Sequence, residues 1–193
     1  MTAVGDSISP HLLLVSSRWW YRLAMGMRNY LIEGVSGTGK TSVCKELQRR
    51  GYQAINGDRE LRYQGDPETG TPTDTFTSAR HKSPLWDVEK VQAFVANKDE
   101  AVTFFCGGSR NLEKFLELFD GVFILEVDLD TCLRRIDERV ALDPTDWGGK
   151  PEERERAVRL HQTKENIPQT GIIIDATAPL ARVVDEIVGH IPL

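Results

Sequence analysis

Long apolar runs are absent from this sequence of 193 residues, and so are basic runs and closely paired cysteines. No stretch approaches the roughly 20 apolar residues that a membrane-spanning helix needs, so no membrane partner is expected. The formal net charge is −5, which argues against nucleic acid as the main partner. The three cysteines lack Cys-x-x-Cys spacing and favour buried thiols in a reducing, cytoplasmic compartment over a disulfide framework or a zinc site.

The length predicts one domain with an N-terminal extension. Residues 1–26 differ from the rest of the chain, because a short apolar stretch precedes an aromatic and basic one. Asp6 is the only early charge, so the basic start of a signal peptide is missing. An amphipathic membrane anchor is an alternative, since Trp and Arg suit an interface. We expect an extension at 1–26, with Trp19 and Trp20 as candidates for docking it on the main domain at 27–193.

From residue 28 onward, strand-like and helix-like segments alternate. Short apolar runs predict five strands, at residues 29–33, 52–55, 101–106, 122–125 and 172–175. Apolar residues at helical spacing predict helices at 40–50, 86–96, 111–119 and 130–140, one that begins at Pro151, and one at 180–188. This alternation predicts an α/β fold, a five-stranded parallel sheet with helices on both faces.

Two segments without clear periodicity are predicted to be loops. Residues 65–84 contain two glycines and three prolines, with Thr at every second position from 69 to 77. We favour a polar loop over the substrate site, with an edge strand or a surface loop without a role as alternatives. His81 and Trp86 are candidates for lining an acceptor pocket. Residues 142–150 are turn-rich and are predicted to form a mobile lid.

The sequence GVSGTGKT at residues 34–41 fits G-x-x-x-x-G-K-[ST], the phosphate-binding loop. Glycine permits backbone angles that a β-carbon forbids, so successive N–H groups can face phosphate oxygens at a helix N-terminus. Lys40 can reach the outer phosphates, and the Thr41 hydroxyl can ligate Mg²⁺. A strand-like segment before the loop and a helix-like one after it supply the required context. The nucleotide-binding residues expected here are Gly34, Ser36, Gly37, Thr38, Gly39, Lys40, Thr41 and Ser42.

Polar and glycine residues follow the second and third predicted strands, at the sheet edge where α/β proteins bind ligands. Asp58 can accept a proton from an attacking hydroxyl or hold Mg²⁺ through water, and capping of the next helix is the alternative. Gly107 and Gly108 let a substrate approach the backbone closely, or else form a tight turn. Arg110 can bind an anionic group through paired hydrogen bonds, or else lie solvated on the surface.

Two arginines, Arg135 and Arg139, precede the predicted lid. A cation delivered by a moving lid can neutralise charge that develops on a transferred phosphoryl group. Ordinary ion pairs with the neighbouring acids Asp137 and Glu138 are the alternative.

With these parts placed, residues 28–190 resemble the small P-loop kinases, the group that includes shikimate kinase, gluconate kinase and the nucleoside monophosphate kinases. The loop GVSGTGKT matches that group, and residues 56–60 are similar to its D-x-D segment. Gly107-Gly108-Ser109 is similar to the glycine triplet after the group's third strand. The helix that ends at Arg139 is similar to the one that leads into the lid, and residues 175–180 resemble the adenine-contacting loop.

The resemblance implies a three-layer P-loop NTPase fold with a mobile lid, and ATP-dependent phosphoryl transfer to a small-molecule acceptor. The catalytic residues would be Lys40, Asp58 and Arg139. Further nucleotide contacts would come from Arg135, Asp175, Ala176 and Pro179. The partners would be ATP with Mg²⁺ and a small acceptor, and the protein would be a monomer or homodimer.

Two alternatives remain open. A nucleoside or nucleotide kinase would need several arginines around an acceptor phosphate, which Arg59, Arg62, Arg80 and Arg110 can supply. A regulatory NTPase would need an apolar strand that ends in an acid, which residues 122–128 can supply. For transfer to an acceptor, the expected substrate-binding residues are Asp58, Arg62, Arg80, Gly107, Gly108 and Arg110.

Overall fold

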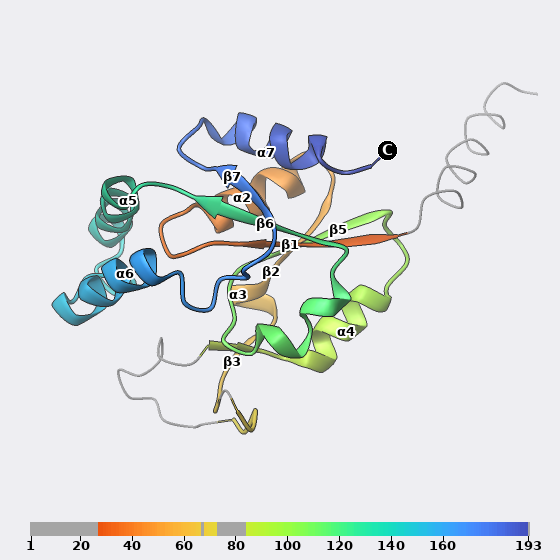
Figure 1. Ribbon diagram of the computed structural model, residues 1–193, viewed down its shortest axis with the longest axis horizontal. Coiled ribbons are helices and arrows are strands. Elements are labelled where there is room, and N and C mark those ends of the chain that lie inside the picture. The colour runs from red at the N-terminus through yellow and green to blue at the C-terminus, as the bar shows by residue number, and fades with distance from the viewer. Residues whose placement is uncertain (1–26, 67, 73–83, 193) are drawn as a thin grey trace, which may run out of the picture.

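The computed structural model describes residues 27–66, 68–72 and 84–192, so the expected extension at 1–26 lies outside the described residues. The main sheet has five parallel strands in the order β2-β5-β1-β6-β7 (Figure 1). The strands are β1 (Arg28–Glu33), β2 (Gln53–Asn56), β5 (Val102–Cys106), β6 (Gly121–Glu126) and β7 (Ile172–Asp175). The predicted five-stranded parallel sheet is confirmed.

The central strands are apolar because both of their faces are covered. In β1 every residue after Arg28 is buried, and in β5 every residue after Val102. The edge strand β7 differs, since Ile172 and Ile173 are exposed. Because all five strands run parallel, their carboxyl ends and the loops that follow meet at one edge of the sheet.

Helices cover both faces of the sheet (Figure 1). On one face, α2 (Lys40–Arg49) and α7 (Leu180–Gly189) share an apolar core with Ile32. On the other face, α4 (Val88–Ala96) shares a second core with Leu31. Successive strand residues point to opposite faces, which is why Leu31 and Ile32 belong to different cores. The predicted three-layer α/β fold is confirmed.

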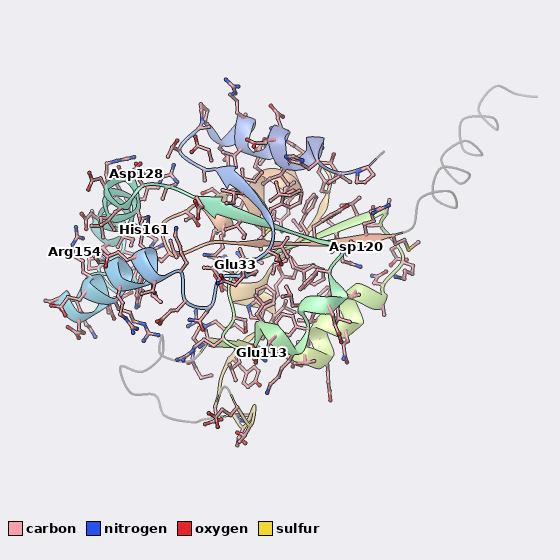
Figure 2. The ribbon with its side chains drawn as sticks, viewed as in Figure 1. Glu33, Glu113, Asp120, Asp128, Arg154 and His161 are labelled. Atoms are coloured by element: carbon pink, nitrogen blue, oxygen red, sulfur yellow. The ribbon has the colours of Figure 1, made fainter. Side chains whose placement is uncertain are left out.

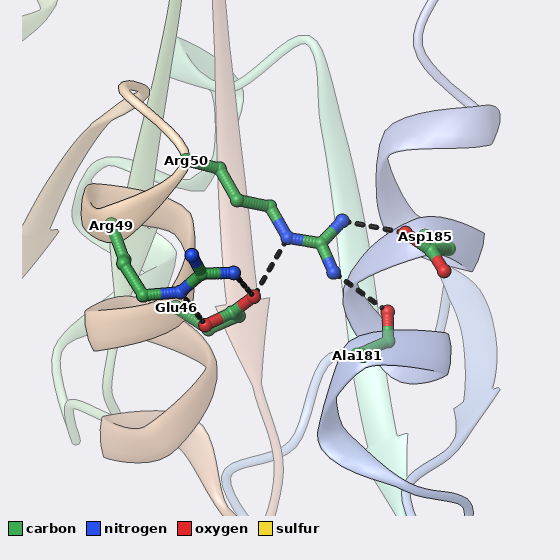
Figure 3. Close-up of polar contacts among 5 residues, drawn as sticks. All are labelled: Glu46, Arg49, Arg50, Ala181 and Asp185. Atoms are coloured by element: carbon green, nitrogen blue, oxygen red, sulfur yellow. Dashed lines mark hydrogen bonds and ion pairs between the residues drawn. The ribbon is translucent and has the colours of Figure 1, made fainter.

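Ionic contacts join the far end of α2 to α7 (Figure 3). The Arg50 guanidinium donates to Asp185 Oδ1 at 2.6 Å and to the Ala181 carbonyl at 2.9 Å. Hydrogen bonds from Arg49 and then from Arg50 lower the pKa of Glu46 to about 2. These contacts hold the helix that follows the phosphate loop against the last helix of the chain.

The predicted helix at 86–96 begins later than expected. Trp86 ends strand β4 (Pro84–Trp86), which pairs antiparallel with β3 (Arg62–Gln64) in a separate two-stranded sheet. Asp87 caps α4, and its side chain accepts a hydrogen bond from Lys90 N at 3.2 Å. The apolar spacing included Trp86 because its side chain is also buried, although it belongs to a strand.

The predicted loop at 65–84 is described only in part, because residue 67 and residues 73–83 lie outside the described residues. Gly65 and Pro72 form an isolated antiparallel bridge. The choice between a loop and an edge strand at 69–77 therefore stays untested.

The predicted helix at 111–119 is wrong. The segment forms two short 3₁₀ helices, η1 (Leu112–Lys114) and η2 (Leu116–Leu118). Phe115 separates them with φ −146° and ψ 6°, and its buried ring stacks on Trp86 with 5.7 Å between ring centroids. A 3₁₀ helix also places residues i and i+3 on one side, so apolar spacing alone did not distinguish the two helix types.

Two further helices, α5 (Leu129–Leu142) and α6 (Pro151–Thr163), follow β6 along the chain. Arg154 of α6, labelled in Figure 2, pairs with Asp137 of α5. Residues 143–150 connect the helices where the lid is predicted, and the mobility of this segment stays a prediction. Across the described part of the chain, no helix has the length and apolar character needed to cross a bilayer.

Candidate active site

Glycines give the loop between β1 and α2 its shape. Gly34, Gly37 and Gly39 have φ angles of 154°, 88° and 99°, which residues with side chains rarely adopt. A β-carbon at Gly34 would lie 2.6 Å from the Leu125 carbonyl oxygen, and one at Gly37 would lie 2.8 Å from the Cys132 carbonyl oxygen. Gly39 is the N-cap of α2, where the first N–H groups have no partner within the helix. This backbone can cradle a phosphate group.

Some side chains of the loop bond to its own backbone, and others are exposed to solvent. Lys40 Nζ donates to two carbonyls of the loop, of which Val35 O is 3.2 Å away. The Thr38 hydroxyl is buried and donates to the same Val35 carbonyl at 2.8 Å, so it shapes the loop. Thr41 and Ser42 are exposed in the first turn of α2, where a ligand can reach their hydroxyls.

Two arginines of α5 lie beside the phosphate loop. Arg135 Nη2 donates to the Ala176 carbonyl at 2.9 Å, and its Nη1 lies 3.4 Å from two carbonyls of the loop. Arg139 Nη2 donates to the Trp147 carbonyl at 2.9 Å and to Ser36 Oγ at 3.4 Å. Both guanidiniums are therefore placed where they can meet phosphate charge.

The alternative that these arginines pair with neighbouring acids of α5 is wrong. Glu138 pairs with Arg134 at 2.8 Å, and Asp137 pairs with an arginine of α6. Arg139 Nε instead lies 2.8 Å from Asp146 Oδ2, in the segment between α5 and α6. Arg139 thus connects the phosphate loop with the predicted lid.

The segment expected to contact adenine follows β7. Asp175 Oδ1 accepts hydrogen bonds from Thr177 N at 2.9 Å and from the Thr177 hydroxyl at 2.6 Å, which closes a turn. Ala176 is buried, and its N–H donates to a carbonyl at the end of β6 at 2.8 Å. Pro179 is the N-cap of α7. Because Arg135 bonds to both segments, this turn and the phosphate loop lie next to each other.

Asp58 lies beside the glycine pair that follows β5. A β-carbon at Gly107 would be 3.1 Å from Asp58 Oδ1 and 2.9 Å from the Trp86 ring, and φ at Gly107 is 150°. Asp58 is exposed in the first turn of α3 (Gly57–Glu60). The alternative that Asp58 caps this helix is wrong, because Asn56 holds the cap position. The Asp58 carboxylate is therefore accessible at the carboxyl edge of the sheet.

Trp86 packs behind these residues and is fully buried, so its predicted place in the lining of an acceptor pocket is wrong. The ring is fully buried, and a β-carbon at Gly57 would come within 2.0 Å of it. The backbone N–H of Trp86 donates to Ser109 Oγ and to Asn111 Oδ1, both at 3.0 Å. Ser109 therefore follows the glycine pair as a residue that fastens β4 to this turn.

Arginines on several elements are further candidates for the site. Arg62 lies on β3, and Arg110 directly follows the turn after β5. The sequence interpretation missed Arg156 of α6, whose pKa is lowered by burial and then by the charges of Arg110 and Arg159. The charges of Arg110, Arg156 and Arg159 therefore act on one another, and Glu165, which pairs with Arg159, acts on Arg156 in the opposite direction. Two other candidates lie outside the described residues, Arg80 and His81.

Glu33, the last residue of β1, was also missed (Figure 2). Its side chain is buried, its Oε1 accepts from Gly34 N at 2.9 Å, and its Oε2 has no hydrogen-bond partner among the described residues. Burial raises the pKa of Glu33 to about 8, although the charge of Lys40 and the Gly34 N–H act to lower it. The available signal was an acid at the end of an apolar strand, directly before the phosphate loop.

The phosphate loop suits a Mg²⁺ ion that takes most of its ligands from water and from the phosphates of a bound nucleotide. The described residues contain no group of three or more His, Cys, Asp or Glu side chains that could enclose a metal ion. Mg²⁺ usually keeps several waters and takes few protein ligands when it binds phosphates, an arrangement that the exposed Thr41 hydroxyl fits. The predicted buried thiols are confirmed at Cys44, Cys106 and Cys132.

Comparison with known proteins identifies the family. Residues 31–161, more than half of the chain, match the family described as AAA domain. A search of curated proteins finds no match. A gluconokinase from Sinorhizobium meliloti 1021 aligns with a TM-score of 0.52 and 20% identity, over 86% of this chain and 91% of that chain. A sugar kinase from Janibacter sp. HTCC2649 aligns with a TM-score of 0.52 and 16% identity, over 84% of this chain and 93% of that chain. The chain therefore belongs to the AAA-domain family and has the fold of the small P-loop kinases.

Proposed function

We propose that this protein transfers the γ-phosphoryl group of ATP to a small-molecule acceptor, as a kinase of the shikimate-kinase or gluconate-kinase type. The observation that carries the proposal is the position of Asp58 beside Gly107, at the same sheet edge as the phosphate loop. The likeness in fold to a gluconokinase and a sugar kinase supports it. Phosphoryl transfer depends mainly on positioning and charge neutralisation, which these residues can supply.

The donor half would bind ATP. N–H groups of the loop and Lys40 would hold the phosphates, and the backbone of residues 175–179 would hold the adenine. Mg²⁺ bound to the Thr41 hydroxyl would neutralise part of the phosphate charge. Arg135 and Arg139, both within 3.4 Å of loop atoms, would offset the charge on the transferred group.

The acceptor half would orient and activate a hydroxyl. Asp58 would accept the hydrogen bond of the attacking hydroxyl and take its proton as the oxygen attacks phosphorus. The cations Arg110 and Arg156 would bind an anionic group of the same molecule. We therefore propose an acceptor that carries a carboxylate or a phosphate as well as a hydroxyl.

The segment at 143–150 would close over both halves. Its Asp146 and Trp147 already bond to Arg139, so closure would deliver that arginine together with the segment and exclude water. We further propose that the protein acts in the cytoplasm as a monomer or homodimer, where its buried thiols stay reduced.

The same arginine cluster favours a second candidate, a nucleoside monophosphate kinase, because the acceptor of such an enzyme is itself a phosphate. A panel of hydroxy acids, sugar acids, nucleosides and nucleoside monophosphates, with ADP formation as the readout, separates the candidates. We expect ADP formation that depends on one anionic acceptor class and disappears in Lys40→Ala. ATP hydrolysis at the same rate with and without every acceptor would contradict the proposal and indicate a regulatory NTPase.

A further inference from the structure

Glu33 joins the two halves of the site. It ends β1, where Glu33 pairs in register with Ile124 of β6 and Ile32 pairs with Cys106 of β5. Successive residues of β1 point to opposite faces, so Glu33 points away from the face of Ile32. It lies on the same face as Leu31, which α4 covers. Only 2% of Glu33 is exposed. An ionisable group is thus enclosed at the junction between the phosphate loop and the strands.

Four elements surround the Glu33 carboxyl. The phosphate loop donates Gly34 N–H to Oε1 at 2.9 Å, and a β-carbon at Gly108, after β5, would lie 2.8 Å from the same oxygen. Lys40 from α2 and Asp58 from α3 are near enough for their charges to act on it in opposite directions. The carboxyl therefore lies between the residue assigned to the outer phosphates and the residue assigned to the acceptor hydroxyl.

The hydrogen bonds of this cluster favour a protonated Glu33. Oε2 is buried without a partner among the described residues, and Lys40 Nζ donates to loop carbonyls. A buried carboxylate without compensating donors is costly, whereas a carboxylic acid gains a donor of its own. The pKa of about 8 agrees with this arrangement, since it leaves Glu33 mostly protonated at neutral pH.

We propose that Glu33 is a positioning residue that works as a neutral carboxylic acid in the nucleotide-bound protein, fixing Gly34 N–H with one oxygen and offering the proton on the other to a bound phosphate oxygen. This role rests on the proposed kinase function. A neutral Glu33 leaves the charge of Lys40 to the phosphates, and an ionised one repels them. ATP binding above neutral pH therefore takes up a proton from solvent at Glu33.

Other titrating groups near the cluster define the controls. Lys40 and Asp58 are near enough to Glu33 for their charges to act on it. The neighbouring thiols differ, since a hydrogen bond with Cys106 lowers the pKa of Cys44, whereas burial raises the pKa of Cys106 well above its usual range. Cys44→Ser is therefore the control that separates proton uptake at Glu33 from titration of a neighbouring thiol.

Calorimetry of ATP and Mg²⁺ binding to the full chain tests the proposal, in buffers of different ionisation enthalpy between pH 7 and 9 and without acceptor. We expect uptake of about half a proton per ATP at pH 8 in the wild type and in Cys44→Ser, and none in Glu33→Gln. ATP affinity of the wild type should fall by up to about tenfold per pH unit above 8. At pH 7, Glu33→Met should weaken ATP binding about tenfold, and Glu33→Gln, which keeps an acceptor and a donor, should restore it.

Each contrary result has a distinct meaning. Proton release, or uptake that persists in Glu33→Gln, would overturn the role of Glu33 while leaving the kinase proposal in place. Failure of the folded wild type to bind ATP would overturn both. If Glu33→Gln does not fold, the wild type still decides, because an ATP affinity that is constant between pH 7 and 9 contradicts the proposal.

Discussion

The donor and acceptor halves of the site are built in different ways. The phosphate-binding part of the proposed donor half is one continuous segment, residues 34–41, whose shape comes from glycine φ angles and a helix N-terminus. The proposed acceptor half would be assembled from α3, the turn after β5 and α6, with Asp58, Gly107 and Arg156 as its residues. Neighbouring residues of one loop form the first, and residues far apart in the sequence would form the second. A local motif can therefore specify nucleotide binding, whereas recognition of the acceptor needs the tertiary fold.

The largest expected effect on turnover comes from removing Lys40 from the proposed donor half. Lys40→Ala should lower turnover by roughly 10³-fold, because the cation that meets the outer phosphates is lost. Steady-state kinetics with the acceptor found in the panel measures the change. Lys45→Ala is the matched control, since Lys45 is an exposed lysine of the same helix. Full turnover in Lys40→Ala would refute the assignment of the donor half.

A smaller effect on turnover, with little effect on ATP binding, is expected from removing the Asp58 carboxylate. Asp58→Asn should lower kcat by roughly 10²-fold and change the KM for ATP less than about twofold, because only proton acceptance from the hydroxyl is lost. Glu89→Gln, at an exposed acid of α4, serves as the control. Loss of ATP affinity with intact kcat would make Asp58 a structural part of the donor half.

Removal of Arg156 should weaken binding of the acceptor. Arg156→Gln should raise the KM for the acceptor about tenfold and leave the KM for ATP unchanged, because one hydrogen bond to a charged group is lost. Arg154→Gln is the matched control, since Arg154 lies on the same helix and pairs with Asp137. Equal effects of the two substitutions on acceptor KM would remove Arg156 from the acceptor half.

The smallest expected effect is on stability, and it depends on Glu33, which lies between the two proposed halves. The pKa of Glu33 rises from 4.5 to about 8 on folding, so the folded protein binds the extra proton between these values. The free energy of unfolding should therefore fall as pH rises through this window, by at most about 1.4 kcal/mol per pH unit. This contribution is fully present below pH 4.5 and lost above about pH 8.

Urea unfolding of the wild type and Glu33→Gln from pH 5 to 9 measures this contribution. The wild type should lose stability relative to Glu33→Gln as pH rises through the window. A constant difference between the two proteins would show that Glu33 keeps its ordinary pKa on folding.

The sheet and the phosphate loop could be predicted because their signals are local. Apolar runs marked the strands, and glycine spacing marked the loop, so neither depended on distant contacts. The segment at 111–119 could not be assigned correctly, because burial of Phe115 against Trp86 decides its form. Trp86 itself belongs to a strand whose partner, β3, lies more than 20 residues earlier in the chain.

Two other residues of the proposed site were harder to find for the same reason. Arg156 looks like one of many charged residues on a polar helix, and only the fold brings it near Arg110. Glu33 looks like the polar end of a strand, and only the packing of Gly34 and Gly108 around it shows that its carboxyl is enclosed. The place of Asp58 at the carboxyl edge of the sheet could be predicted, because an α/β pattern indicates parallel strands whose carboxyl ends share one edge.

The fate of the γ-phosphoryl group tests the proposed transfer site between the phosphate loop and Asp58. Labelled ATP, the responsive acceptor and the wild-type protein should yield labelled acceptor in an amount equal to the ADP formed. Asp58→Asn should lose this transfer and still bind ATP. Free phosphate as the only labelled product, formed equally by the wild type and Asp58→Asn, would contradict a transfer site between the phosphate loop and Asp58.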